Sequence, residues 1–255
     1  MRPAPPRRNR VTPLGEIVAV DLRGGWTGNR GILHRGAGGE AEIVRDHVGI
    51  AWITCVLQFR GRRIPQWAAG HYTPLFFQDE AVAFAAGHRP CAECRRPAFR
   101  AFLDALAAAG GSRPAGGGRP VGGGRPVGAA GGGVPTRAPD LDRLLDGQRR
   151  LPRTSRRRLH DRPWRGLPDG TFVVHEGAPA VLVGDALVRW GPLGYRAASR
   201  RPTAGRAQLL TPPATVTALA AGYPVQIDDQ ARQPGLLRAA QTRSSTDDSS
   251  SATER

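Results

Sequence analysis

A low-complexity segment at residues 110–139 most constrains how this chain can fold. It repeats Arg-Pro-Val-Gly between runs of glycine and contains no apolar residue larger than valine. Such a segment buries too little apolar surface to offset the conformational entropy lost on ordering. We therefore expect a flexible insertion there, which leaves residues 11–109 and 167–230 to form the folded structure.

The remaining segments are basic or polar. We expect a disordered basic arm at residues 1–10, where proline and arginine dominate, and a disordered tail at 231–255, which is rich in serine. Residues 140–166 are predicted to be a basic linker, within which Asp140 can cap a short helix that ends at Arg149. A chain of 255 residues is long enough for one large domain or two small ones.

The first folded stretch is predicted to be β-rich with two helices. Alternating β-branched residues indicate a strand at 15–22, and the apolar run 51–59 indicates a second one. Helices are expected at 79–86 and 97–109. The first of these should end at Gly87, which follows it in the position that helices commonly give to glycine.

The second folded stretch is predicted to be a β-meander followed by a helix. Short apolar runs at 171–175, 180–183 and 186–190 are separated by turns that contain glycine. A segment that begins with prolines and ends with glycine predicts the helix at 211–222. The predicted fold class is therefore α+β, with two units.

Arginine supplies every basic residue, because the chain has no lysine. Thirty-seven arginines against 21 acidic residues give a formal net charge of +16. Residues 106–170 carry 13 of these arginines and only five acids. The electric field of such an excess of positive charge attracts polyanions, and the guanidinium group binds phosphate in a forked geometry. The alternative is a solvated linker whose composition reflects a GC-rich genome.

If the charge marks a nucleic-acid interface, its centre is the arginine run that begins at residue 149. The predicted phosphate contacts are Arg149, Arg150, Arg156, Arg157 and Arg158, together with Arg95 and Arg96.

Cys91 and Cys94 form a Cys-x-x-Cys pair directly after the first predicted helix. Two thiols at this spacing can bind one ion from a tight turn, and thiolates suit zinc in tetrahedral geometry. A second Cys-x-x-Cys pair is missing, so any further ligands must come from single residues. The pair is otherwise a redox motif, two small apolar residues in a turn, or the relic of a lost site.

The candidates for the other two ligands are Cys55, His71, His47, His34 and His88. Cys55 and His71 are the best placed, because each lies on or beside a predicted strand upstream of the pair. Arg89-Pro90 is expected to turn His88 outward. We therefore predict a zinc site formed by Cys91, Cys94, His71 and Cys55, which would staple the β-rich unit.

Residues 76–97 resemble the second half of the Ada-type zinc-binding domain. The resemblance rests on an aromatic strand, a short Glu/Ala-rich helix and the string Gly87-His-Arg-Pro-Cys-Ala-Glu-Cys-Arg95. It implies that Cys91 and Cys94 are the second of two zinc-ligand pairs. The first pair of that family, which supplies its methyl-accepting cysteine, has no counterpart here. The resemblance therefore cannot support a repair activity. It implies a structural metal site and, more weakly, one that faces nucleic acid.

The chain as a whole is similar to a set of uncharacterised bacterial proteins. The shared strings are Asn9-Arg-Val-Thr-Pro-Leu-Gly-Glu-Ile17, Gly28-Asn-Arg-Gly-Ile-Leu-His34, Gly87-His-Arg-Pro-Cys91, Leu167-Pro-Asp-Gly170 and Leu210-Thr-Pro-Pro213. This similarity implies no particular activity.

These observations favour a zinc-containing protein that binds nucleic acid over an enzyme. One rival is a metal-dependent enzyme with an open coordination position, for which His71, Cys91 and Cys94 would be the ligands. Another is a protein-interaction module without a nucleic-acid partner.

Nucleotide-binding glycine loops, the Gly-x-Ser-x-Gly elbow and the His-Glu-x-x-His motif do not occur. With three cysteines, no signal peptide and no long apolar run, we expect a cytoplasmic protein without a membrane partner.

Overall fold

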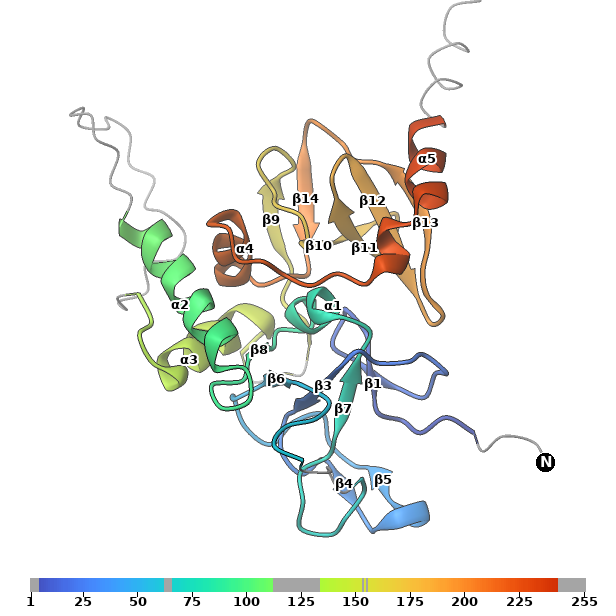
Figure 1. The fold of residues 1–255 in the computed structure, drawn as a ribbon, viewed down its shortest axis with the longest axis vertical. Helices are drawn as coiled ribbons and strands as arrows, with labels where there is room; N and C mark the ends of the chain where they lie inside the picture. The colour runs from blue at the N-terminus through green and yellow to red at the C-terminus, as the bar shows by residue number, and fades with distance from the viewer. Residues whose placement is uncertain (1–4, 62–65, 112–133, 153, 155, 243–255) are drawn as a thin grey trace, which may run out of the picture.

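The computed structural model describes residues 5–61, 66–111, 134–152, 154 and 156–242 (Figure 1). The fold is α+β, as predicted. Within these residues it comprises two six-stranded sheets, a two-stranded sheet and five α-helices.

The first sheet is built from the N-terminal part of the chain in the order β2-β1-β7-β3-β6-β8. Its strands are short: β1 Arg10–Val11, β2 Ile17–Val18, β3 Trp26–Asn29, β6 Ile53–Cys55, β7 Leu75–Phe77 and β8 Arg89–Pro90. A two-stranded sheet of β4 (His34–Arg35) and β5 (Glu42–Ile43), with the 3₁₀ helix η1 (Gly38–Glu40) between its strands, lies at one end of the molecule (Figure 1).

The second sheet follows the order β13-β12-β11-β10-β14-β9, and all its pairs are antiparallel. Its strands are β9 His160–Pro163, β10 Phe172–His175, β11 Ala178–Val183, β12 Ala186–Gly191, β13 Gly194–Arg200 and β14 Arg206–Leu209. Strands β10 to β13 form the predicted meander, extended by one strand. Successive residues of β11 pack on opposite faces: Val181 and Val183 join one apolar cluster, and Ala180 and Leu182 join another. The sheet is therefore covered on both faces, which explains the uninterrupted apolar run.

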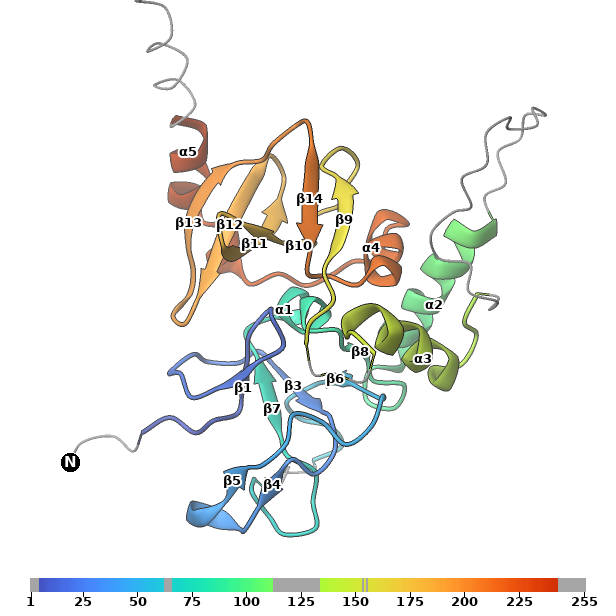
Figure 2. The same cartoon turned by 180° about the vertical axis from the view of Figure 1, so that it is seen from behind.

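The helices are α1 Glu80–Ala85, α2 Arg96–Gly111, α3 Ala138–Arg149, α4 Pro213–Ala220 and α5 Pro234–Thr242, with a 3₁₀ helix η2 at Asp229–Arg232. Helix α1 lies between the two large sheets in both views (Figures 1 and 2). All six of its residues are buried. The main core contains Phe77 of the first sheet, Val82 of α1 and Phe172 of the second sheet. The two predicted units therefore share one hydrophobic core.

Asp79 connects α1 to the second sheet. As the N-cap of the helix, its Oδ1 accepts a hydrogen bond of 2.8 Å from the backbone N–H of Val82. Its Oδ2 accepts from the hydroxyl of Tyr195 at 2.8 Å and from the backbone N–H of Asp228 at 2.9 Å. Burial is the largest influence on this carboxyl group and raises its pKa to about 6.

Helices α2, α3 and α4 form a second apolar cluster beside α1. Phe99, Phe102 and Leu106 recur along one face of α2 and are buried against Leu145 of α3 and Ala218 of α4. The helix predicted to end at Arg149 is thus confirmed as α3. It packs into the fold instead of lying in a linker, because Leu141 and Leu145 are both fully buried.

Some expectations differ from the structure. The strand predicted at 51–59 is limited to β6, because its antiparallel partner β3 pairs with it over only three residues. The predicted arm includes buried Asn9, and the predicted tail includes α5, whose Leu236 and Leu237 pack against the main core. The greater part of the predicted insertion, at 112–133, lies outside the described residues, as do residues 1–4 and 243–255.

Candidate metal centre and arginine-lined hollow

Two parallel strands bring Cys55 next to Cys91. Strand β6 ends at Cys55, and its Thr54 pairs with Pro90 of β8. The backbone N–H of Cys91 then donates a 2.9 Å hydrogen bond to the carbonyl oxygen of Thr54. Cys91 is therefore held beside the end of β6, although the two cysteines are far apart in the sequence.

The turn after β8 adds Cys94 to this pair. The backbone N–H of Glu93 donates to Sγ of Cys91 at 3.4 Å, and that of Arg95 donates to the carbonyl oxygen of Cys91 at 3.2 Å. The ligand atoms of Cys55, Cys91 and Cys94 all lie within 4.8 Å of one another. These three residues, named the thiol trio below, are close enough to hold one metal ion.

The three thiols are coupled electrostatically. Hydrogen bonds from Cys55 and then from Cys94 lower the pKa of Cys91 to about 2. The same contact with Cys91 raises the pKa of Cys55 well above its ordinary value. Cys91 is the most buried of the three. Burial raises the pKa of the nearby Tyr72 hydroxyl, and the cysteines add to this effect.

The structure brings Cys55 to the Cys91–Cys94 pair but leaves His71 outside the group. His71 is exposed, and its Nδ1 lies 3.1 Å from the carbonyl oxygen of Ala69. Among the described residues, no fourth His, Cys, Asp or Glu side chain joins the trio within that distance. The expectation that His88 turns outward is wrong, because this residue is fully buried.

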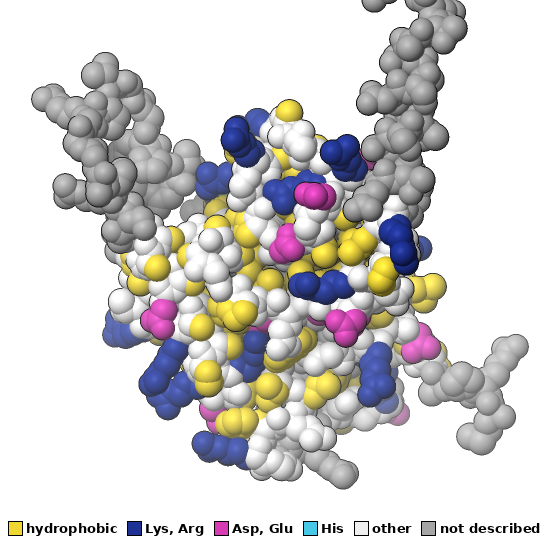
Figure 3. Space-filling view, turned by 45° about the horizontal axis from the view of Figure 1, so that its top comes forward, with side chains coloured by type: hydrophobic (Ala, Val, Ile, Leu, Met, Phe, Trp, Pro, Cys, Tyr) yellow, Lys and Arg dark blue, Asp and Glu magenta, His cyan; other side chains and the backbone are white. Residues whose placement is uncertain are grey.

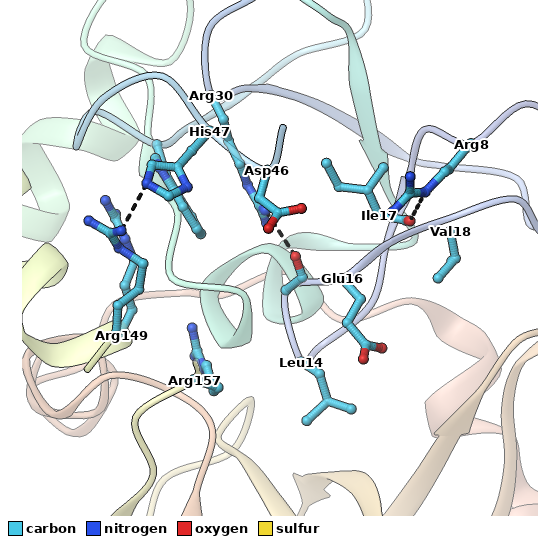
Figure 4. A pocket seen from close by; sticks show the side chains of 13 residues that line it. Arg8, Leu14, Glu16, Ile17, Val18, Arg30, Asp46, His47, Arg149 and Arg157 are labelled. Carbon is cyan, nitrogen blue, oxygen red and sulfur yellow. Dashed lines mark hydrogen bonds between the residues drawn. The ribbon is translucent and has the colours of Figure 1, made fainter. Parts of the chain in front are cut away.

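A second site lies around Trp52. A hollow of about 400 Å³ opens between the loop that precedes β2 and the C-terminal end of α3 (Figure 4). Its lining includes five arginines, a histidine, a tryptophan and two acids: Arg8, Arg30, Arg149, Arg150, Arg157, His47, Trp52, Glu16 and Asp46. Its volume is near the lower end of the range of about 300–1,000 Å³ for ligand pockets.

Trp52 holds two of these arginines. The guanidinium carbon of Arg30 lies 3.9 Å from the centre of the indole, and that of Arg149 lies 4.0 Å from it. Both arginines are among the most deeply buried side chains, with exposed fractions of 2% and 0%. The cation–π contacts fix the two guanidinium groups in place.

The segment Gly87-His88 forms the floor beneath them. Arg30 donates from Nε to Nε2 of His88 at 3.1 Å, and Arg149 donates from Nη1 to the carbonyl oxygen of Gly87 at 3.1 Å. Gly87 has a φ of +91°, and a Cβ atom there would lie 2.7 Å from Cδ of Arg149. Only glycine therefore permits the close approach of Arg149.

Positive charge is incompletely balanced in the hollow. Burial lowers the pKa of Arg30, Arg149 and Arg157, and their mutual repulsion adds to the effect for Arg30 and Arg157. One carboxylate, Asp146, contacts both Arg149 and Arg150, at 2.9 and 2.6 Å. Arg157 instead donates to the backbone carbonyl groups at the end of α1 and to that of Leu210.

The predicted nucleic-acid contacts have very different environments. Arg149 is fully buried, and Arg95 is buried in a 2.5 Å ion pair with Glu80. Arg96 and Arg156 are exposed, whereas Arg150, Arg157 and Arg158 are partly buried. On the face drawn in Figure 3, arginine side chains are scattered and do not gather in one stripe.

Sequence reasoning missed Arg30, Trp52 and His88 as parts of one site. The available signal was the string Gly87-His-Arg-Pro-Cys91, whose first two residues contact the arginines and whose last residue belongs to the thiol trio.

Comparison of the chain with family models, with curated proteins and with solved structures gives no match. Within the described ranges, the helices are too short or too polar to cross a membrane.

Proposed function

We propose that this protein binds nucleic acid and that a zinc ion on the thiol trio staples its fold. The observation that carries the nucleic-acid proposal is the convergence of Arg30, Arg149, Arg150 and Arg157 on one hollow. Because these arginines come from both sides of the 110–139 segment, folding concentrates a positive charge that the chain carries in separate places. Concentrated guanidinium groups are typical of phosphate recognition.

The composition of the trio supports a structural metal. Structural zinc sites contain two to four thiolates, with histidine completing the set, whereas typical catalytic sites have three protein ligands that include at least one histidine and keep an open position. Three thiolates also supply more negative charge to the ion than histidines would, which weakens it as a Lewis acid. The position of the trio supports the same role, because it links β6 to the turn that begins α2.

A metal-dependent enzyme is the second candidate. The observation in its favour is that the trio supplies three ligands, and no fourth side chain of the usual types joins them in the described parts of the chain. Substitution of the metal by cobalt separates the two roles. A spectrum that changes when cyanide or azide is added indicates an open position, and an unchanged spectrum supports a closed structural site.

The salt dependence of binding tests the nucleic-acid proposal. We expect the affinity for a fluorescent 20-nucleotide single strand to fall by about 0.7 log unit per log unit of salt for each phosphate neutralised, and by about 0.9 for duplex DNA. Arg156→Gln should reduce this slope by the contribution of one phosphate. Exposed Arg196 of β13 is not among the residues that line the hollow and provides the matched control, Arg196→Gln. Absence of binding at 20 mM salt would refute the proposal.

A further inference from the structure

The charges of the hollow identify the kind of group that it accepts. Arg30 and Arg157 make no ion pair with a carboxylate within 4.0 Å among the described residues, and Arg149 shares Asp146 with Arg150. Asp46 and Glu16 also line the hollow and are exposed (Figure 4), and the charge of Asp46 only partly offsets the lowering of the pKa of Arg30 by burial. Burying cations without partners is costly, so an anion that enters the hollow would be strongly stabilised.

These arginines also retain hydrogen-bond donors that no described group uses. Nη2 of Arg30, Nε of Arg149 and Nε of Arg157 are buried and have no acceptor among the described residues. The other nitrogen atoms of these groups are engaged by backbone carbonyls, His88 or Asp146. These bonds and the indole of Trp52 hold the guanidinium groups in place before any ligand arrives, which lowers the entropic cost of binding.

Trp52 does not serve as a stacking platform for a base. Arg30 and Arg149 lie over its ring within about the same distance, at 3.9 and 4.0 Å, and the tryptophan itself is only 5% exposed. The hollow therefore presents charged guanidinium groups and little aromatic surface to a ligand. This combination fits recognition of a phosphate group and not of a nucleobase.

We propose that the arginine-lined hollow binds a phosphate monoester, such as the 5′-terminal phosphate of a nucleic-acid strand. A monoester carries about −1.5 to −2 charges at neutral pH and three free oxygen atoms. An internal phosphodiester carries a single charge, and its chain continues on both sides. A terminal group can enter the hollow end-on and bring the larger charge to several arginines at once. The identity of the attached molecule rests on the proposed function, but the phosphate site does not.

The first measurement asks whether the hollow binds phosphate. We expect inorganic phosphate to raise the Tm of the full chain by several degrees more than chloride at equal ionic strength, since a ligand that binds only the folded state stabilises it. Adenosine 5′-monophosphate should act in the same way, whereas adenosine should not. Equal effects of phosphate and chloride would overturn the proposal.

The second measurement identifies the source of the phosphate. A single strand labelled at its 3′ end is compared with and without a 5′-phosphate by fluorescence anisotropy. We expect at least tenfold tighter binding of the phosphorylated strand, and a ratio near one in Arg150→Gln. Arg150 lies at the rim and is partly exposed, so its replacement is less disruptive than that of buried Arg30. Arg196→Gln removes the same charge elsewhere and should keep the full ratio.

The outcomes separate this inference from the proposed function. If phosphate stabilises the protein but neither strand binds, the hollow binds a free phosphorylated molecule and the nucleic-acid proposal fails. If both strands bind equally and phosphate has no specific effect, nucleic acid binds elsewhere and the phosphate site is refuted.

Discussion

Arg30 donates a 3.1 Å hydrogen bond from Nε to Nε2 of His88, and both side chains are buried. Nε2 can accept this bond only while the imidazole is neutral. Burial, followed by the nearby charges of Arg30 and Arg149, accordingly lowers the pKa of His88 well below its ordinary value. The contact places His88 under the arginines, only three residues before Cys91 of the thiol trio. One short segment, Gly87 to Cys91, therefore supports both candidate sites.

The first prediction concerns the metal. We expect about one zinc ion per wild-type chain by mass spectrometry of the metal content, and a loss of most of it in Cys55→Ser, Cys91→Ser and Cys94→Ser. Removal of the ion by a chelator should lower the Tm by on the order of 10 °C, because a structural metal contributes several kcal/mol to folding.

His71→Ala is the matched control for the metal prediction, since the structure leaves His71 exposed and outside the trio. This variant should keep its zinc and its Tm. Loss of zinc from His71→Ala would restore this histidine as a ligand, and a wild-type chain without metal would leave the trio as a set of free thiols.

The second prediction tests the glycine beneath Arg149. Gly87→Ala introduces a strained φ of +91° and a Cβ that meets Cδ of Arg149 at 2.7 Å. Gly222→Ala provides the control, because its φ is +93° but no atom lies within 4 Å of the added Cβ. The strain alone should cost about 1–2 kcal/mol in both variants. The clash should cost Gly87→Ala about 1–3 kcal/mol more. Urea denaturation measures the difference. Equal losses of unfolding free energy in the two variants would show that the side chain of Arg149 moves aside without cost.

The third prediction separates Arg95 from a surface phosphate contact. Its partner Glu80 is buried and also accepts hydrogen bonds from the hydroxyl of Tyr223 and the backbone N–H of Gln226. Arg95→Met would leave this carboxylate without a countercharge, and we expect a loss of about 3–5 kcal/mol in the free energy of unfolding.

The control for Arg95 is an exposed ion pair of the same type. Arg35 contacts Glu42 at 2.9 Å with 77% of its side chain exposed, so Arg35→Met should change the stability by less than about 1 kcal/mol. If Arg95→Met is as stable as Arg35→Met, the pair with Glu80 does not support the fold.

The fourth prediction concerns pH. The pKa of Asp79 is raised from 3.8 to about 6 in the folded state, so the folded protein binds a proton there more readily than the unfolded chain. The resulting contribution to stability is complete below pH 4 and is lost as the pH rises through 6. A shift of this size corresponds to about 3 kcal/mol.

Asp79→Asn removes this titration. As the pH rises from 4 to 7, the unfolding free energy of wild type should therefore fall relative to that of the variant, whatever the difference between the two proteins at pH 4. A difference that stays constant over this range would show that Asp79 titrates normally. Chemical denaturation at each pH provides the measurement.

The sequence by itself determined the features that depend on neighbouring residues. Glycine after an alanine-rich helix predicted the end of α1 at Gly87. The helix that ends at Arg149 was also predicted, but its expected cap, Asp140, lies in the first turn, and Arg137 occupies the N-cap position. Alternating apolar runs separated by turns predicted the meander. These signals are local, because helix caps, turns and strand periodicity are set by residues within a few positions of one another.

Only the tertiary structure decided which residues join Cys91 and which arginines face solvent. Cys55 reaches the trio because β6 and β8 run side by side, a pairing that no local pattern encodes. Arg95 and Arg96 are adjacent, yet one is buried against Glu80 and the other is exposed. Arg149 is the last residue of α3 and packs against the ring of Trp52, whereas Arg156 is exposed to solvent. The sequence supplies the charge, but long-range packing decides where each guanidinium group lies and therefore what it can bind.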